Sequence, residues 1–167
     1  MTASIKILRN LELTNTAFLK HCDSITKNYK RVLFINLMAK NKSEQILTDA
    51  LENLIQKNNL ENIRYEFFDF HSACKGQKFE NLELLTSKIS DVVENFKFFA
   101  EQIKKDQKIL LLQEGTVRIN CLDCLDRTNV VMTKIAALNF ESIMKHMTTN
   151  LSLALGIEIK NIFKNYL

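Results

Sequence analysis

The chain has 167 residues, of which 46% are apolar and 25% charged, a balance typical of soluble globular proteins and not of disordered ones. Its formal net charge of +4 is too small for the dense basic stripe that a nucleic-acid-binding protein carries, so no nucleic-acid partner is expected. The longest apolar runs, at residues 32–35 and 109–112, are far shorter than the roughly 20 residues of a membrane-spanning helix.

Few helix breakers interrupt the predicted elements. The sequence has no proline and only three glycines, which favours long helices and gives no sign of a domain boundary, so residues 1–167 are predicted to form a single domain. Helices are predicted from apolar residues at helical spacing, and strands from short apolar or aromatic runs. In chain order, we expect a helix at 14–27, a strand at 31–37, a helix at 43–56, a strand at 63–70, a helix at 81–104, strands at 108–112 and 116–120, a helix at 128–146 and another helix from about residue 157.

Helices that alternate with strands are typical of α/β proteins, so the expected fold is a mixed central β-sheet flanked by helices. Residues 1–13 lack the apolar stretch and cleavage site of a signal peptide, which makes the cytoplasm the expected compartment. Residues 1–40 carry seven Lys and Arg against Glu12 and Asp23, a local charge of +5 that leaves about −1 for the rest of the chain. This bias suits an anionic membrane surface or an ordinary solvated face.

Residues 118–129 (R-I-N-C-L-D-C-L-D-R-T-N) carry the candidate chemistry. They follow a predicted strand and lead into a predicted helix, and Cys121 and Arg127 bracket five residues in a C-x5-R-T pattern. A loop of this length at a helix N-terminus turns backbone N–H groups inward and forms an anion site. The helix dipole and Arg127 favour a thiolate at Cys121 that can attack phosphorus.

The neighbouring side chains suit phosphoryl transfer. The guanidinium of Arg127 can hold two phosphoryl oxygens at once, and Thr128 can hydrogen-bond the thiolate or assist its departure. Asp123 and Asp126 are candidates for the acid that protonates the leaving oxygen and then activates water. This chemistry requires no metal and no other cofactor.

Other interpretations of the C-x-x-C pair, Cys121 and Cys124, stay open on the residues alone. Four cysteines are too few and too unevenly placed for a disulfide scaffold. The pair could be a dithiol redox centre, or the C-x5-R spacing could be accidental. It could also be half of a zinc site, whose other ligands would come from His21, Cys22, His71, Cys74 or His146.

Residues 118–129 resemble the signature R-x-N-C-x-D-C-L-D-R-T-N of Sac-domain phosphoinositide phosphatases and match each of its fixed positions. Residues 68–71, 74–76 and 79–81 are similar to the family's D-F-H, C-x-G and E-N block. Residues 32–37 with Ser43-Glu44 resemble its strand and S-E turn, although Lys42 stands where a glycine is common. Gln113, Gly115 and Val117 resemble the segment before the loop, and residues 17–160 align in order.

The resemblance implies a cysteine-phosphatase-like fold and hydrolysis of a phosphate monoester on a membrane phosphoinositide, such as the 4-phosphate, through a cysteinyl phosphate. It implies Cys121 as nucleophile, Arg127 as the phosphate-binding arginine, and Asp126 as a better candidate than Asp123 for the acid because it adjoins Arg127. Thr128 completes the catalytic set. The substrate-binding candidates are Arg118, Asn120, Leu122, Cys124, Leu125 and Asn129. Asp69 and His71 either orient the loop or form a buried polar pair.

The resemblance also sets expectations for partners and extent. The implied partners are a phosphoinositide lipid and a membrane surface, with peripheral attachment on the cytosolic face of internal membranes. The family's N-terminal subdomain and its tryptophan-containing C-terminal motif have no counterpart here, so a partial Sac catalytic domain is expected, marginally stable and weakly active alone. The alternative is a degenerate Sac chain that binds headgroups or a partner without turnover.

Overall fold

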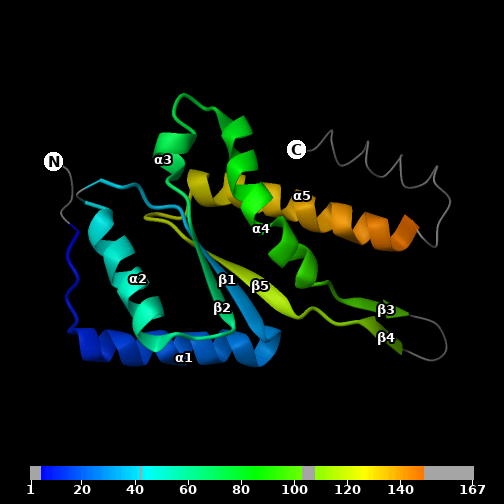
Figure 1. The fold of residues 1–167 in the computed structure, drawn as a ribbon, viewed down its shortest axis with the longest axis horizontal. Coiled ribbons are helices and arrows are strands. Elements are labelled where there is room, and N and C mark those ends of the chain that lie inside the picture. The colour runs from blue at the N-terminus through cyan, green and yellow to red at the C-terminus, as the bar shows by residue number, and fades with distance from the viewer. Residues whose placement is uncertain (1–4, 42, 103–107, 149–167) are drawn as a thin grey trace.

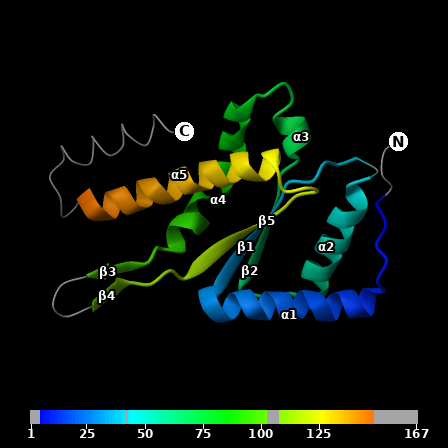
Figure 2. The ribbon, with the colours of Figure 1, turned by 180° about the vertical axis from the view of Figure 1, so that it is seen from behind.

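In the computed structural model, which describes residues 5–41, 43–102 and 108–148, helices flank a small parallel sheet (Figures 1 and 2). The α/β class predicted from the sequence is therefore confirmed. In chain order the elements are α1 (Leu11–Tyr29), β1 (Arg31–Asn36), α2 (Gln45–Asn58), β2 (Ile63–Phe67), α3 (Phe70–Ala73), the 3-10 helix η1 (Phe79–Leu82), α4 (Glu83–Asn95), β3 (Ala100–Gln102), β4 (Lys108–Leu111), β5 (Gly115–Asn120) and α5 (Asp126–Thr148).

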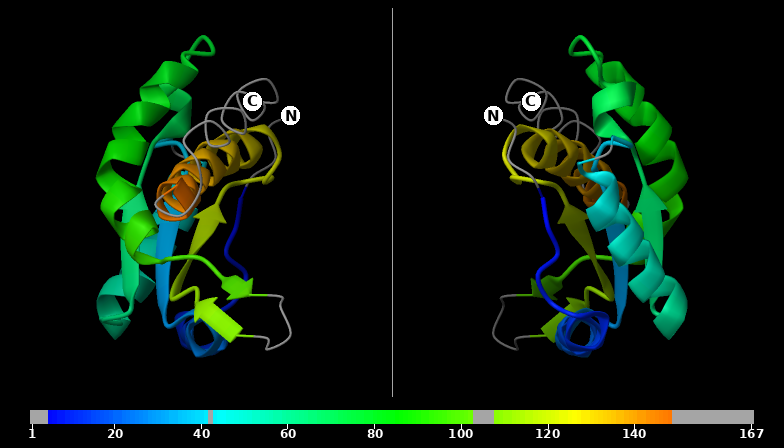
Figure 3. Two further views of the ribbon diagram at one scale, coloured as in Figure 1. Left: turned by 90° about the vertical axis from the view of Figure 1, so that its right-hand side faces the viewer. Right: turned by 90° about the vertical axis from the view of Figure 1, so that its left-hand side faces the viewer.

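The central sheet has the strand order β2-β1-β5, and both pairs are parallel, with Val32 opposite Ile63 on one side and Thr116 on the other. The expectation of a mixed central sheet is thus wrong for the described residues. The strand predicted at 108–112 exists as β4, but it pairs antiparallel with β3 in a separate hairpin that projects from the body (Figure 3). Lys97 follows α4 with a φ of 57°, in the left-handed region, so the chain turns away from the sheet there.

Strand β1 is buried on both faces, as expected for the middle strand of a parallel sheet. Successive side chains of a strand point to opposite faces, and they divide the core into two clusters. Val32 and Phe34 pack with Phe18 of α1 and Leu54 of α2. On the other face, the buried cluster that includes Leu33 and Ile35 draws on α4 and α5, with members Leu85, Ile89, Val131 and Ile135.

Several predicted boundaries move because tertiary contacts override local pattern. The helix expected at 81–104 ends at Asn95, and Phe99, counted in its apolar stripe, is 55% exposed. The strand expected at 63–70 ends at Phe67, and Asp69 caps the short helix α3 by accepting a hydrogen bond from the Ser72 N–H at 2.9 Å. The helix expected from about residue 157 lies outside the described residues.

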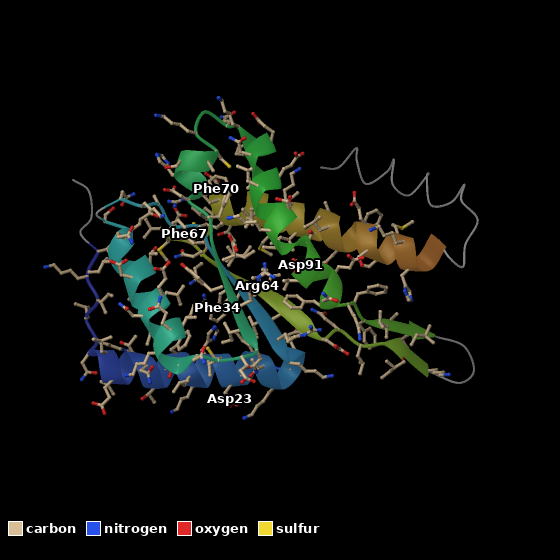
Figure 4. All side chains as sticks on the ribbon, in the orientation of Figure 1. Asp23, Phe34, Arg64, Phe67, Phe70 and Asp91 are labelled. Atoms are coloured by element: carbon tan, nitrogen blue, oxygen red, sulfur yellow. The ribbon has the colours of Figure 1, made fainter. Side chains whose placement is uncertain are left out.

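Charged side chains of α4 also form ion pairs with residues of the edge strand β2. Arg64 and Asp91 point toward one another in Figure 4, with Nη1 and Oδ2 3.3 Å apart, and Lys88 Nζ lies 3.0 Å from Glu66 Oε1. Such exposed pairs contribute little, about 0–1 kcal/mol each. The apolar clusters, and not these ion pairs, therefore hold the helices on the sheet.

Gly115 opens β5 beside the ring of the buried Phe96, and a Cβ at this position would overlap that ring. We therefore expect Gly115→Ala to lower the free energy of unfolding by about 1–3 kcal/mol, the usual cost of overpacking. Urea unfolding followed by circular dichroism measures this change. Ser90→Ala on the exposed face of α4 is the control, expected to stay within about 0.5 kcal/mol of wild type. An unchanged midpoint for Gly115→Ala would contradict the packing described here.

Candidate active site

The candidate site lies where the carboxyl ends of the three central strands meet. Parallel strands bring the segments that follow them to one edge of the sheet, which is where α/β proteins bind ligands. These segments are residues 37–44 after β1, 68–69 after β2 and 121–125 after β5, gathered near the start of α5 in Figure 1. The Leu37 N–H donates to the Asn120 carbonyl oxygen at 2.9 Å, and the Phe68 N–H donates to that of Asn36 at 2.9 Å. The edge is therefore continuous.

Residues 121–125 form a tight turn directly before α5. The Leu125 N–H donates to Asp123 Oδ1 at 3.3 Å, and the Asn129 N–H donates to the Leu125 carbonyl oxygen at 3.1 Å, which begins the helix. Cys124 has a φ of 56°, a left-handed conformation that a non-glycine residue seldom adopts. The turn thus places its backbone at the N-terminus of a 23-residue helix, where the N–H groups and the helix dipole favour an anion.

The two cysteines of the turn differ in their surroundings. Cys121 is buried directly after β5, whereas Cys124 is exposed and its Sγ lies 3.7 Å from the Cys121 carbonyl oxygen. Both thiols are free, as are those of Cys22 and Cys74. The described ranges contain no group of three His, Cys, Asp or Glu side chains suited to hold a metal ion. Within these ranges, the Cys121–Cys124 pair therefore has no third ligand for a zinc ion.

Arg127, in the first turn of α5, extends back toward the segment after β1. Its Nη1 donates to Glu44 Oε2 at 2.9 Å and to the Leu37 carbonyl oxygen at 3.4 Å, and its Nη2 donates to Glu44 Oε1 at 3.4 Å. The hydrogen bond with Glu44 raises the pKa of Arg127, and the nearby Cys121 and Asp123 add to the effect. Cys121 and Asp123 therefore lie close enough to Arg127 to interact with its charge.

Glu44 is a functional candidate to which the sequence assigned no role. It is buried, and besides Arg127 its Oε2 accepts a hydrogen bond from the Ala39 N–H at 2.9 Å. Burial alone would raise the pKa of this carboxyl, but the hydrogen bonds from Arg127 and Ala39 outweigh that effect and the pKa is lowered. The only sequence signal was the Ser43-Glu44 pair within the family resemblance, because 83 residues separate Glu44 from Arg127.

Thr128 and Asn120 carry buried oxygens that have no hydrogen-bond partner among the described residues, Oγ1 and Oδ1 respectively. Such atoms are costly unless a water or a ligand satisfies them. Thr128 also borders a cavity of about 310 Å³ between β5 and α5, which is otherwise lined mainly by apolar side chains.

Arg118, predicted to bind substrate, lies toward α1. Its Nε donates to His21 Nε2 at 2.8 Å, and its Cζ stands 5.2 Å from the centroid of the Phe34 ring. Burial and the neighbouring Arg118 lower the pKa of His21, which keeps the imidazole a neutral acceptor. In this structure Arg118 joins β5 to α1.

The remaining predicted residues lie on the surface of the turn and of the first turn of α5. The side chains of Leu122, Asp123, Leu125, Asp126 and Asn129 are exposed. Asp123 lies within the turn, where its Oδ1 accepts a hydrogen bond from the Leu125 N–H, and its charge adds to the raised pKa of Arg127. Asp126 is instead the first residue of α5.

Asp69 caps α3 and holds the segment that follows β1. Its Oδ2 accepts a hydrogen bond from the Lys40 N–H at 3.1 Å and thereby fixes the segment after β1, while His71 is exposed. The predicted alternative of a buried Asp69–His71 pair is wrong. Asp69 makes no recorded hydrogen bond to the described residues of the 121–129 stretch.

Comparisons with known proteins match this chain to phosphoinositide phosphatases. A family model described as the SacI homology domain matches residues 1–75. Phosphatidylinositide phosphatase SAC2 of Danio rerio is 37% identical over 131 residues, 78% of this chain and 11% of that protein. Phosphatidylinositol-3-phosphatase SAC1-A of Danio rerio is 34% identical over 128 residues, covering 77% and 22%. Inositol-1,4,5-trisphosphate 5-phosphatase 1 of Schizosaccharomyces pombe is 34% identical over 147 residues, covering 87% and 13%.

The chain thus spans 11–22% of the length of these relatives. A match over 87% of the chain must include the region from Glu44 to Asn129, wherever the match begins. Glu44, the turn at 121–125 and Arg127 therefore all lie within the part that is similar to the relatives.

Proposed function

Since this chain belongs to the SacI homology family of phosphoinositide phosphatases, we propose that it hydrolyses a phosphate monoester on the inositol ring of a membrane phosphoinositide. One arrangement supports this above all. The turn at 121–125 lies at the N-terminus of α5, and the Arg127 guanidinium lies close to the Cys121 thiol and the Asp123 carboxylate. Backbone N–H groups, the helix dipole and Arg127 supply positive charge for three phosphoryl oxygens.

The first step is attack on phosphorus by the Cys121 thiolate. The new S–P bond forms as the bond from phosphorus to the inositol oxygen breaks, and an aspartic acid of the turn protonates that oxygen. We assign this proton to Asp123 in preference to Asp126, because Asp123 lies within the turn, where its Oδ1 accepts from the Leu125 N–H, whereas Asp126 is the first residue of α5. The products are a cysteinyl phosphate and the ring hydroxyl.

The second step regenerates the thiol. The ionised Asp123 takes a proton from water, the water oxygen attacks phosphorus, and the S–P bond breaks to leave inorganic phosphate and the Cys121 thiolate. The Thr128 hydroxyl, which has no hydrogen-bond partner among the described residues, is suited to donate a hydrogen bond to the departing sulfur. None of these steps consumes a cofactor.

Because the proposed substrate is a lipid, we propose that this chain binds membranes peripherally, on the cytosolic face of internal membranes. Within the described ranges, no helix combines the length and the apolar character needed to cross a bilayer. Two basic residues of the region 1–40, Lys30 and Arg31, lie 3.9 and 3.3 Å from Glu114 in pairs that stay exposed at the surface. They therefore remain available to an anionic membrane surface together with the other basic residues of the region.

Phosphate release from soluble short-chain phosphoinositides tests the proposal. The panel contains each monophosphorylated and bisphosphorylated headgroup, including the expected 4-phosphate, because the relatives are named for different ring positions. We expect turnover that survives a metal chelator and is blocked by orthovanadate, which mimics five-coordinate phosphorus. Activity lost with chelator and restored by a divalent cation would contradict the mechanism. Headgroup binding without phosphate release would favour a chain that binds but does not catalyse.

A further inference from the structure

The contacts of Arg127 divide its five N–H donors into two sets. Glu44 takes one hydrogen on Nη1 and one on Nη2, and the Leu37 carbonyl oxygen takes the other hydrogen on Nη1. This leaves the Nε–H and one Nη2–H, for which none of the described residues provides an acceptor. These two donors lie side by side on one edge of the planar guanidinium, in the spacing that binds two oxygens of a phosphoryl group.

Glu44 is itself held firmly enough to orient a partner. Its side chain is 8% exposed against 22% for Arg127, and the Ala39 N–H fixes its Oε2. Its own backbone N–H donates to Asn41 Oδ1 at 2.9 Å. An arginine side chain is otherwise long and flexible, and an ordered carboxylate reduces the freedom that it must lose when phosphate binds.

We propose that Glu44 is the positioning residue of the phosphate-binding arginine: by occupying the end of the guanidinium, it leaves the Nε–H and Nη2–H pair for the phosphoryl group at the turn. This inference rests on the proposed function and names a residue for it. Glu44 acts through Arg127 and touches no reacting atom. The segment after β1, which supplies Glu44, thereby controls the geometry of a loop that follows β5.

A structural role for Glu44 predicts a different outcome from a positioning role, and Asp69 provides the matched control. Both carboxylates hold the segment after β1, Glu44 through the Ala39 N–H and Asp69 through the Lys40 N–H, but only Glu44 binds Arg127. Loosening that segment should therefore affect Glu44→Gln and Asp69→Asn alike. Loss of arginine positioning should affect Glu44→Gln alone.

The experiment measures kcat and KM on a soluble phosphoinositide, and the dissociation constant of orthovanadate by calorimetry, for the full chain and three variants. We expect Glu44→Gln to lower kcat/KM about 10- to 100-fold, mainly through kcat, and to weaken vanadate binding by a similar factor. Glu44→Asp, which keeps the charge, should recover part of the loss. Asp69→Asn should stay within about threefold of wild type in kcat/KM, as expected for a residue without contact to the guanidinium.

Equal losses in Glu44→Gln and Asp69→Asn, or unchanged kcat and vanadate affinity in Glu44→Gln, would overturn the inference. Thermal melting checks that each variant folds. If Glu44→Gln does not fold, Glu44→Asp is compared with Asp69→Asn instead. An intermediate loss of kcat/KM in Glu44→Asp, without a loss in Asp69→Asn, would then support the inference. A wild type that releases no phosphate defeats the proposed function. The vanadate measurements then still decide whether Glu44 prepares Arg127 for an anion.

Discussion

Replacing Cys121 with serine should abolish phosphate release, by at least about a thousandfold. A serine hydroxyl in the same position is almost entirely protonated at neutral pH, and neither the helix dipole nor Arg127 lowers its pKa enough to make it a comparable nucleophile. The measurement is phosphate release from the best substrate of the panel. In parallel, wild type quenched in acid during turnover should retain labelled phosphate on the protein, and Cys121→Ser should retain none.

The matched control is Cys124→Ser, three residues along the same turn. Cys124 is exposed, and its Sγ–H donates to the Cys121 carbonyl oxygen. A serine hydroxyl can donate the same hydrogen bond, so this variant should keep a good part of the activity. An inactive Cys124→Ser beside an active Cys121→Ser would reverse the assignment of the nucleophile.

Asp123→Asn should slow hydrolysis of a phosphoinositide by about 100- to 10,000-fold, the contribution of a positioned general acid. The amide cannot protonate the leaving inositol oxygen, whose conjugate acid is weak. With an aryl phosphate, whose leaving group departs without a proton, the first step should be affected much less. Burst kinetics with the aryl substrate separate this first step from the hydrolysis of the cysteinyl phosphate, which still needs the base.

Asp126→Asn is the control for this prediction. Its carboxylate lies at the first position of α5 and is exposed, so the variant should lose less than about tenfold on either substrate. A selective loss on the lipid in Asp126→Asn, with Asp123→Asn nearly normal, would return the acid role to Asp126, which the sequence order alone favours. Equal losses on both substrates in Asp123→Asn would indicate that Asp123 holds the turn through the Leu125 N–H.

Elements with a strong local pattern were predictable from the sequence. The helix expected at 43–56 is α2 at Gln45–Asn58, and the strand expected at 31–37 is β1 at Arg31–Asn36, because spacing and apolar runs act within a few residues. The C-terminal end of the helix expected at 81–104 was not predictable, because its apolar stripe continues beyond Asn95 to Phe99, which the fold leaves exposed. Likewise, a strand pattern at 108–112 does not state which strand it will pair with.

The sequence by itself determined which candidate residues stand together in and beside the turn. Cys121, Asp123, Arg127 and Thr128 lie within eight consecutive residues between a strand and a helix, so chain connectivity alone keeps them together at a helix N-terminus. Only the tertiary structure decided which face of the guanidinium is available. The parallel pairing of β1 with β5 brings Glu44 to Arg127 across 83 residues. Contacts between distant segments depend on which strands become neighbours in the sheet, and local patterns do not encode that order.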